Sequence, residues 1–200
     1  MRFFKENSYD IVKLYVNQIG IAIFSFVLYS AVGSMGDDGV ERALNTAISV
    51  FSILFYFALI YNVAWEYGAK DKIRIDAKRA EYDKAKCAKM SLLSCVPNFI
   101  ISAICIIFAL IYKFSGADFA AVIVGVVNFF MRITMSMYLG IIQIIFGSFE
   151  SFADMSFIGS AVAFFVVSFL SVAVSHIGYV FGAKDFKIFS VFGKKTNKGA

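Results

Sequence analysis

The sequence contains little of what a soluble enzyme needs. Its 200 residues include one proline, one tryptophan, one histidine and three cysteines, and charged residues make up only 16%. Cys87, Cys95 and Cys105 show no CxxC or metal-ligand spacing, so neither a disulfide framework nor a metal site is indicated. HExxH, GxSxG, P-loop and GxGxxG signatures are missing, and no pair of carboxylates lies within an apolar run. We therefore expect no catalytic residue, no metal, no cofactor and no enzyme activity.

What the chain does have is a large amount of apolar sequence. Hydrophobic residues make up 60% of it, and 24 residues are Phe. A helix that crosses a bilayer needs about 20 consecutive, largely uncharged residues. Four runs meet this requirement, at residues 14–33, 44–65, 91–112 and 157–181. The sequence therefore predicts an all-α fold, a polytopic helical membrane bundle that forms a single integral membrane domain over residues 1–200.

The charges are unevenly placed, which predicts how the chain threads through the membrane. Residues 68–90 contain eight Lys or Arg and four acidic residues, whereas the connection 34–43 is acidic. Because basic segments stay inside, we expect residues 68–90 and both termini to be cytoplasmic, in a bacterial cell membrane. The expected partner is the lipid bilayer, with anionic headgroups at residues 68–90. A solvated segment that only fixes orientation is the alternative, and the net charge of +5 does not indicate nucleic-acid binding.

One short motif occurs twice. Tyr67-Gly68-Ala69-Lys70-Asp71 closes the second apolar run, and Phe181-Gly182-Ala183-Lys184-Asp185 closes the last one. Glycine can end a helix in the left-handed conformation, lysine can reach the headgroups, and aromatic rings favour the interface. We therefore predict two membrane-interface junctions, formed by Trp65, Gly68, Lys70, Tyr179, Gly182 and Lys184.

The duplicated motif predicts an internal repeat. Because both copies lead lysine out of the membrane on the same side, the repeat would be parallel. The first hairpin would cover residues 1–71 and the second residues 91–185, joined by a basic cytoplasmic loop at 72–90. Residues 186–200 would form a cytoplasmic tail. A chance match is the alternative, since Gly-x-Lys is common at helix ends.

Residues 118–147 carry the most regular pattern in the chain. Small or polar residues recur there at spacings of three and four, which places them on one helical face. A 30-residue helix would be about 45 Å long, too long for an upright span. The segment is predicted either as an outer-side interfacial or re-entrant helix beside four transmembrane helices, or as a fifth, tilted transmembrane helix. Charge favours four, because five spans would place the lysines of the tail outside.

The candidate site residues are polar side chains in apolar surroundings. Arg132 is the only charged residue between Asp118 and Glu150, and a charge at membrane depth is by default a functional candidate. It could instead reach the outer surface as an anchor. The residues that share its face, and that could line a solute site or pack against other helices, are Asn128, Ser136 and Gln143.

Two further polar residues lie near the repeated motifs. Asn62 and His176 occupy equivalent positions before the two glycines. His176 has no partner at ligand spacing, so we expect a hydrogen bond between helices, with Asn62 as its partner, rather than a metal site.

The predicted function is a non-enzymatic bundle that binds or transports a small solute, or serves as a transporter subunit. The alternative is a structural or assembly protein that acts through a membrane-protein partner or a homo-oligomer. An intramembrane enzyme, which would depend on Arg132 and His176, is the least favoured class.

Several segments carry a resemblance to known sequences. They are Val16-Asn17-Gln18-Ile19-Gly20, Trp65-Glu66-Tyr67-Gly68-Ala69-Lys70-Asp71, Val96-Pro97-Asn98 and Gly182-Ala183-Lys184-Asp185. Together they resemble a group of small, uncharacterised polytopic membrane proteins of Gram-positive bacteria. The resemblance covers most of the chain, and it implies a location in the cell membrane without implying any chemistry.

Overall fold

The computed structural model describes residues 2–32, 38–79, 81–147 and 151–186, and this part of the chain consists of helices and their connections, without strands. The prediction of an all-α fold is confirmed. The elements in chain order are α1 (Arg2–Val32), α2 (Asp38–Asp76), α3 (Lys86–Ser94), α4 (Val96–Ser115), α5 (Asp118–Thr134), the 3-10 turn η1 (Ser136–Tyr138), α6 (Leu139–Phe146) and α7 (Met155–Ala183).

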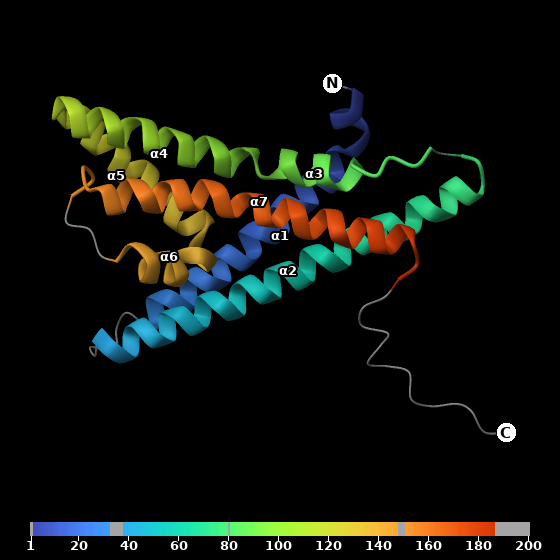
Figure 1. Ribbon diagram of the computed structural model, residues 1–200, viewed down its shortest axis with the longest axis horizontal. Coiled ribbons are helices and arrows are strands. Elements are labelled where there is room, and N and C mark those ends of the chain that lie inside the picture. Colours follow the sequence, from blue (N-terminus) through green and yellow to red (C-terminus); the bar gives the residue numbers. More distant parts are fainter. Residues whose placement is uncertain (1, 33–37, 80, 148–150, 187–200) are drawn as a thin grey trace.

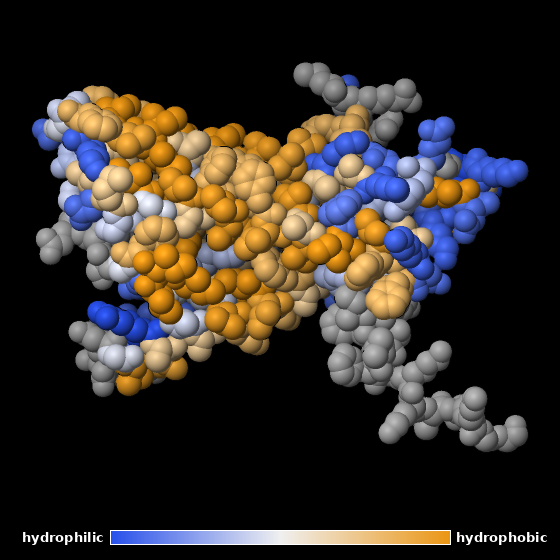
Figure 2. Space-filling model, viewed as in Figure 1, coloured by the Kyte–Doolittle hydropathy of each residue, from blue (hydrophilic) through white to orange (hydrophobic). Residues whose placement is uncertain are grey.

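Four helices are long and apolar enough to cross a membrane. They cover Asn7–Val32, Gly39–Asp76, Val96–Ser115 and Met155–Ala183, close to the four runs expected from the sequence. Figure 2 shows an apolar band around the middle of the molecule, with most of the charged side chains gathered at its ends. Large apolar side chains of this band, such as Phe55 and Val166, are exposed. A surface of this kind is suited to lipid, which supports the membrane class.

The segment 118–147 is not a single helix. α5 and the η1–α6 segment meet at Met135 with a bend of 82°. In Figure 1 α4 stops and α7 begins at the same end of the bundle. The α5–α6 pair enters the bundle from this end and returns to it. The prediction of one continuous polar face is therefore wrong, because the two halves present their side chains in different directions.

Contacts with α1 and α2 hold the bend at Met135. The Ser136 hydroxyl donates a hydrogen bond to the carbonyl of Ala22 on α1. The backbone N–H of Gly140 donates to the Ser49 hydroxyl on α2 at 2.7 Å, and this glycine has no room for a Cβ. The bend thus exchanges hydrogen bonds within one helix for hydrogen bonds to α1 and α2, and both polar groups remain paired.

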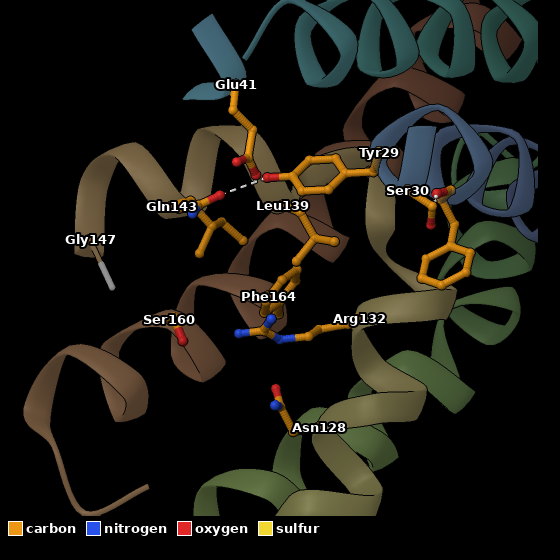
Figure 3. A pocket seen from close by; sticks show the side chains of 12 residues that line it. Tyr29, Ser30, Glu41, Asn128, Arg132, Leu139, Gln143, Gly147, Ser160 and Phe164 are labelled. Carbon is orange, nitrogen blue, oxygen red and sulfur yellow. Dashed lines mark hydrogen bonds between the residues drawn. The ribbon is translucent and has the colours of Figure 1, made fainter. Parts of the chain in front are cut away.

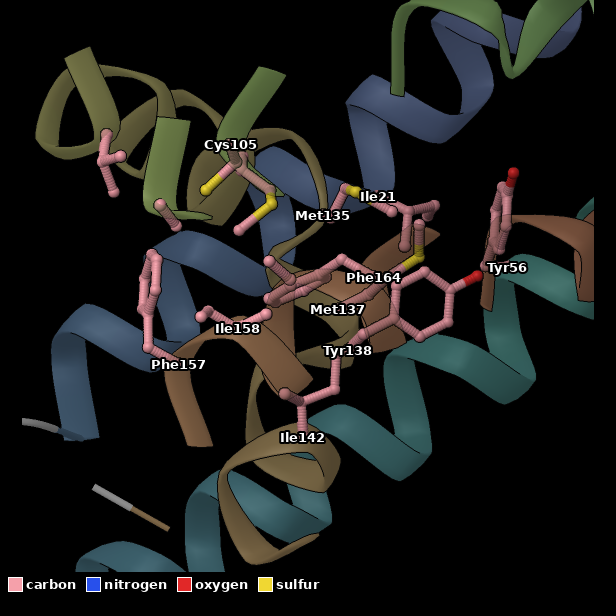
Figure 4. Packing of buried hydrophobic residues seen from close by; sticks show 14 of the residues in the cluster. Ile21, Tyr56, Cys105, Met135, Met137, Tyr138, Ile142, Phe157, Ile158 and Phe164 are labelled. Atoms are coloured by element: carbon pink, nitrogen blue, oxygen red, sulfur yellow. The ribbon is translucent and has the colours of Figure 1, made fainter. Parts of the chain in front are cut away.

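The core lies where this bent segment inserts into the bundle. Met135 and Tyr138 are buried beside the bend. Figure 4 shows them among Ile21, Tyr56 and Phe164, which come from α1, α2 and α7. The Tyr56 hydroxyl donates to Gln18 Oε1 at 3.4 Å, so the one polar atom of this ring also has a partner inside the bundle.

The repeated glycines do not end their helices. α2 continues past Gly68 to Asp76, and α7 continues past Gly182 to Ala183. Among the described glycines, only Gly116 and Gly147 have positive φ angles, of 64° and 70°. The prediction that Gly68 and Gly182 adopt the left-handed conformation is therefore wrong. α7 does end in a left-handed residue within the second motif, but that residue is Asp185, with a φ angle of 57°, so the glycines must have another role.

That role is close packing of α2 against α7. A Cβ added to Gly68 would collide with the carbonyl oxygen of Tyr179, and one added to Gly182 would collide with that of Trp65. One turn earlier on α7, a Cβ at Gly178 would lie 2.7 Å from the carbonyl oxygen of Tyr61. Small residues let membrane helices approach at their backbones, and these glycines do so at the end of the bundle where α2 and α7 converge in Figure 1.

The loop in the basic segment is shorter than the predicted range of 72–90. Residues 72–76 continue α2 and residues 86–90 belong to α3, so only 77–85 lie between helices. The third apolar run is interrupted at Cys95, between α3 and α4. Pro97 stands in the first turn of α4, where its missing N–H removes no helical hydrogen bond.

Candidate functional site

A pocket of about 570 Å³ opens at the end of the bundle where α1 stops and α2 begins. Its polar lining comes from five helices (Figure 3) and consists of Tyr29 and Ser30 on α1, Glu41 on α2, Asn128 and Arg132 on α5, Gln143 on α6 and Ser160 on α7. Phe26, Leu139, Ile142 and Phe164 supply apolar walls between these groups. Polar side chains that converge between apolar walls are the usual composition of a small-molecule site.

Hydrogen bonds fix one side of this pocket. The Tyr29 hydroxyl donates to Gln143 Oε1 at 2.7 Å, which ties the end of α1 to α6. The side-chain amide of Asn45 donates to Glu41 Oε1 at 3.4 Å, one turn along α2. These bonds position an amide and a carboxylate beside each other, and Figure 3 shows both on the same side of the pocket.

The other side of the pocket carries its positive charge. Figure 3 shows the guanidinium of Arg132 and the amide of Asn128 pointing into the space below Gln143 and Leu139. The two residues are one helical turn apart on α5, so their side chains lie on the same face. The pocket thus places a planar cation with several N–H donors opposite the Glu41 carboxylate, with neutral amides and hydroxyls between them.

The structure brings together three of the six polar residues proposed as a site from the sequence. Asn128, Arg132 and Gln143 line the pocket, whereas Ser136 is turned toward α1 by the bend. The spacing that predicted these residues on one helical face does not explain why they meet. Gln143 reaches the pocket from α6, after the change of direction at Met135.

Asn62 and His176 lie outside the pocket and do not form the expected hydrogen bond. α2 faces α7 through Tyr61 and Ala64, which both come close to Gly178. The neighbouring side chain of Asn62 is turned about 100° away from that face and is exposed. His176 is half-buried, and its Nδ1 has no hydrogen-bond partner in the described part of the chain.

Four polar pocket residues were not anticipated, namely Tyr29, Ser30, Glu41 and Ser160. In the sequence, Glu41 is part of an acidic turn. Tyr29, Ser30 and Ser160 lie in apolar runs, which predict only membrane helices. Only the convergence of α1, α2 and α7 around α5 and α6 shows that these residues belong with Arg132.

The predicted junction residues meet at the opposite end of the bundle. The Trp65 indole N–H donates to the carbonyl of Phe186 at 2.9 Å, and the Tyr179 hydroxyl donates to Asp71 Oδ2 at 3.0 Å. Each aromatic ring therefore bonds to the chain that follows the other glycine. Lys70 and Lys184, the two lysines of the motif, are exposed as expected.

The buried charge at this end is Asp71, which was predicted only as part of the repeated motif. Asp71 is only 7% exposed, and its carboxylate accepts hydrogen bonds from Lys86 Nζ at 2.7 and 3.0 Å. Arg74 Nη1 lies 3.9 Å from the same carboxylate. The ion pair joins α2 to α3, and Tyr179 adds α7 to the cluster.

Neither end of the bundle offers a metal centre within the described residues, since no group of three or more His, Cys, Asp or Glu side chains there is placed to hold an ion. The sequence matches no protein-family model, and comparisons with curated proteins and with solved structures give no match either.

Proposed function

We propose that this chain is a multi-pass protein of a bacterial cell membrane that binds a small polar solute in the pocket around Arg132, as a solute-binding or transport-type bundle without enzyme activity. The observation that carries the proposal is the placement of Arg132, Asn128 and Gln143 in one pocket of about 570 Å³ at the open end of an apolar bundle, where Arg132 and Gln143 are exposed to the pocket mouth. A charged residue within an otherwise apolar segment is by default a functional candidate.

The proposed threading has four transmembrane helices, with α5 and η1–α6 as a re-entrant pair. The basic residues of 68–90 lie at one end of the bundle, and the pocket lies at the other, beside the end of α1 and the start of α2. Basic segments remain in the cytoplasm, so the pocket would face outward and both chain termini inward. The reciprocal contacts of Gly68 and Gly182 support the assignment of α1–α2 and α4–α7 as parallel repeats.

The lining specifies the kind of solute. Arg132 would form charge-assisted hydrogen bonds with a carboxylate or another small planar anion, and Asn128 would add a further donor. Glu41, across the pocket, would accept hydrogen bonds from an ammonium or hydroxyl group of the same molecule. The best match is therefore a small zwitterion or hydroxy acid rather than a sugar or an apolar molecule.

Arg132→Gln is expected to weaken binding of such a solute at least about tenfold, because a charge-assisted hydrogen bond contributes roughly 1.5–3 kcal/mol. The measurement is a ligand-induced thermal shift on the detergent-purified protein with a panel of amino acids, hydroxy acids, amines and sugars. Native mass spectrometry would identify any molecule that copurifies. Lys113→Gln is the matched control, since it removes a positive charge from an exposed position near the same end of the bundle.

The proposal fails if no zwitterion or anion in the panel shifts the wild-type protein, or if Lys113→Gln weakens binding as much as Arg132→Gln. If Arg132→Gln instead removes a crosslinked membrane partner and no ligand is found, the alternative role in assembly gains support.

The threading has its own test, which uses the buried native thiols. Cys87, Cys95 and Cys105 are at most 1% exposed, and burial raises the pKa of the Cys87 thiol to about 12. We expect none of them to react with a membrane-impermeant maleimide at neutral pH. In intact cells Ser115→Cys should be labelled, whereas Glu81→Cys and Lys184→Cys should be labelled only after permeabilisation. Labelling of Lys184→Cys in intact cells would contradict four crossings.

A further inference from the structure

A second, smaller cavity lies at the end of the bundle opposite the solute pocket. It has a volume of about 190 Å³ and lies between α1, α2, α3 and α7. Its polar lining consists of Lys70, Arg74 and Lys86, the carboxylates Asp10 and Asp71, and the phenols of Tyr67 and Tyr179. Three cations and two carboxylates give this lining an excess of one positive charge.

The two carboxylates are not equally available. Asp71 is engaged by Lys86 at 2.7 Å and by the Tyr179 hydroxyl at 3.0 Å, so its charge is already compensated. Apart from this compensated carboxylate, the acid that lines the cavity together with Lys70 and Arg74 is Asp10 on α1. Both side chains are exposed, and the guanidinium of Arg74 lies 3.9 Å from Asp71, at the edge of the ion pair.

The surroundings strengthen the preference for an anion. Residues 68–90 carry eight basic and four acidic residues, so the whole segment around the cavity is positive. A cavity with low-dielectric walls concentrates such a field. The apolar helices also leave the membrane here, beside Trp65, which is the depth at which lipid headgroups lie.

The cavity also contains an unused donor. The Tyr67 hydroxyl is buried beside the Asp10 carboxylate, but it makes no hydrogen bond of normal geometry to Asp10 or to any other group in the described part of the chain. A buried hydroxyl without a partner costs free energy, and an oxyanion in the cavity would supply the missing acceptor. On the far side Tyr82 stacks on Tyr179 with the ring centroids 6.3 Å apart, which holds the segment before α3 against the cluster.

We propose that this inner cavity binds a phosphate group, held by Lys70 and Arg74 and by the Tyr67 hydroxyl, with the Asp71–Lys86 pair as its fixed wall. The group could be the headgroup phosphate of an anionic lipid or free phosphate, since both present the same tetrahedral oxyanion. Arginine binds phosphate through two parallel N–H donors and lysine binds it as a point charge, so the two residues are complementary.

The test uses the full-length protein in a neutral detergent with three probes. Radiolabelled inorganic phosphate is followed by equilibrium dialysis, and phosphatidic acid and phosphatidylcholine are followed as retained adducts in native mass spectrometry. Lys70→Gln and Arg74→Gln are each expected to weaken phosphate or phosphatidic acid binding at least about tenfold. The matched controls Lys84→Gln and Arg79→Gln, which remove the same charges from exposed positions in the same basic segment but outside the cavity, should change it by less than about twofold.

The possible results distinguish free phosphate from a lipid headgroup as the ligand, and they include outcomes that would overturn the proposal. Binding of inorganic phosphate indicates a site for the free anion, and binding of phosphatidic acid alone indicates a headgroup site. Absence of both overturns the proposal, as does an equal loss in site and control variants, which would mean diffuse attraction to the basic segment. Arg132→Gln should leave phosphate binding unchanged, so a failed solute pocket and a failed phosphate site can be told apart.

Discussion

Gly182→Ala is expected to destabilise the protein, although alanine is the better helix former. The added methyl group would collide with the backbone carbonyl of Trp65, which cannot rotate away as a side chain can. Overpacking of this kind costs about 3 kcal/mol, and the gain in helix propensity recovers about 1 kcal/mol. The net loss of unfolding free energy should therefore be about 2 kcal/mol, and Gly68→Ala should behave in the same way against Tyr179.

Gly20 is the matched control, and its replacement by alanine is expected to change stability in the opposite direction. Gly20 lies in α1 with no atom within 4 Å of the position of its Cβ. Gly20→Ala should leave stability unchanged or raise it by up to about 1 kcal/mol. Unfolding by sodium dodecyl sulfate in mixed micelles, followed by the fluorescence of Trp65, measures all three variants. Equal stabilities for Gly182→Ala and Gly20→Ala would show that the close approach of α2 and α7 is not a feature of the folded protein.

Lys86→Ala should have the largest effect of any single substitution at the inner end. It would leave the Asp71 carboxylate in a site where only 9% of the side chain is exposed, without its closest cation. Breaking one partner of a buried ion pair costs about 3 kcal/mol, because the remaining charge stays desolvated. The change in unfolding free energy is measured in the same micelle assay.

An exposed ion pair in the same region supplies the control. Lys89 and Asp83 are 2.9 Å apart, with side chains 54% and 44% exposed, so Lys89→Ala should cost less than about 1 kcal/mol. The double variant Lys86→Met with Asp71→Leu should recover much of the unfolding free energy that Lys86→Ala loses, because no charge stays buried. It should still be about 1 kcal/mol less stable than the wild-type protein, because the Tyr179 hydroxyl loses its acceptor. If Lys86→Ala costs no more than Lys89→Ala, the Asp71–Lys86 pair has no structural importance.

The four long apolar helices could be predicted because lipid imposes a simple condition on a sequence that crosses it. Every backbone polar group must be paired within a helix, so an uncharged run long enough to cross is a reliable indicator. The same condition explains why Gly68 was misjudged. Its conformational freedom suggested a helix end, but the helix keeps its hydrogen bonds as far as Asp76, and the small side chain serves contact with α7 instead.

The candidate site could be predicted only in part, for a different reason. Arg132 and Asn128 stand out in the sequence because they interrupt an apolar run. The bend at Met135 has no proline or glycine to announce it, and it depends on contacts of Ser136 and Gly140 with two distant helices. Glu41 joins the site through the same tertiary arrangement, so no local pattern could have identified it.

The glycine contacts between α2 and α7 have a mechanical consequence for the solute pocket. They hold the two long helices together at one end, whereas Glu41 stands about 40 Å further along α2, at a rise of about 1.5 Å per residue. With the crossing as a pivot, a rotation of about 5° would move Glu41 by roughly 3.5 Å over that length. Gly140 on α6 packs against the backbone of Asn45, one turn from Glu41, so such a rotation would carry α6 with α2 and would change the distance from Glu41 to Arg132 on α5.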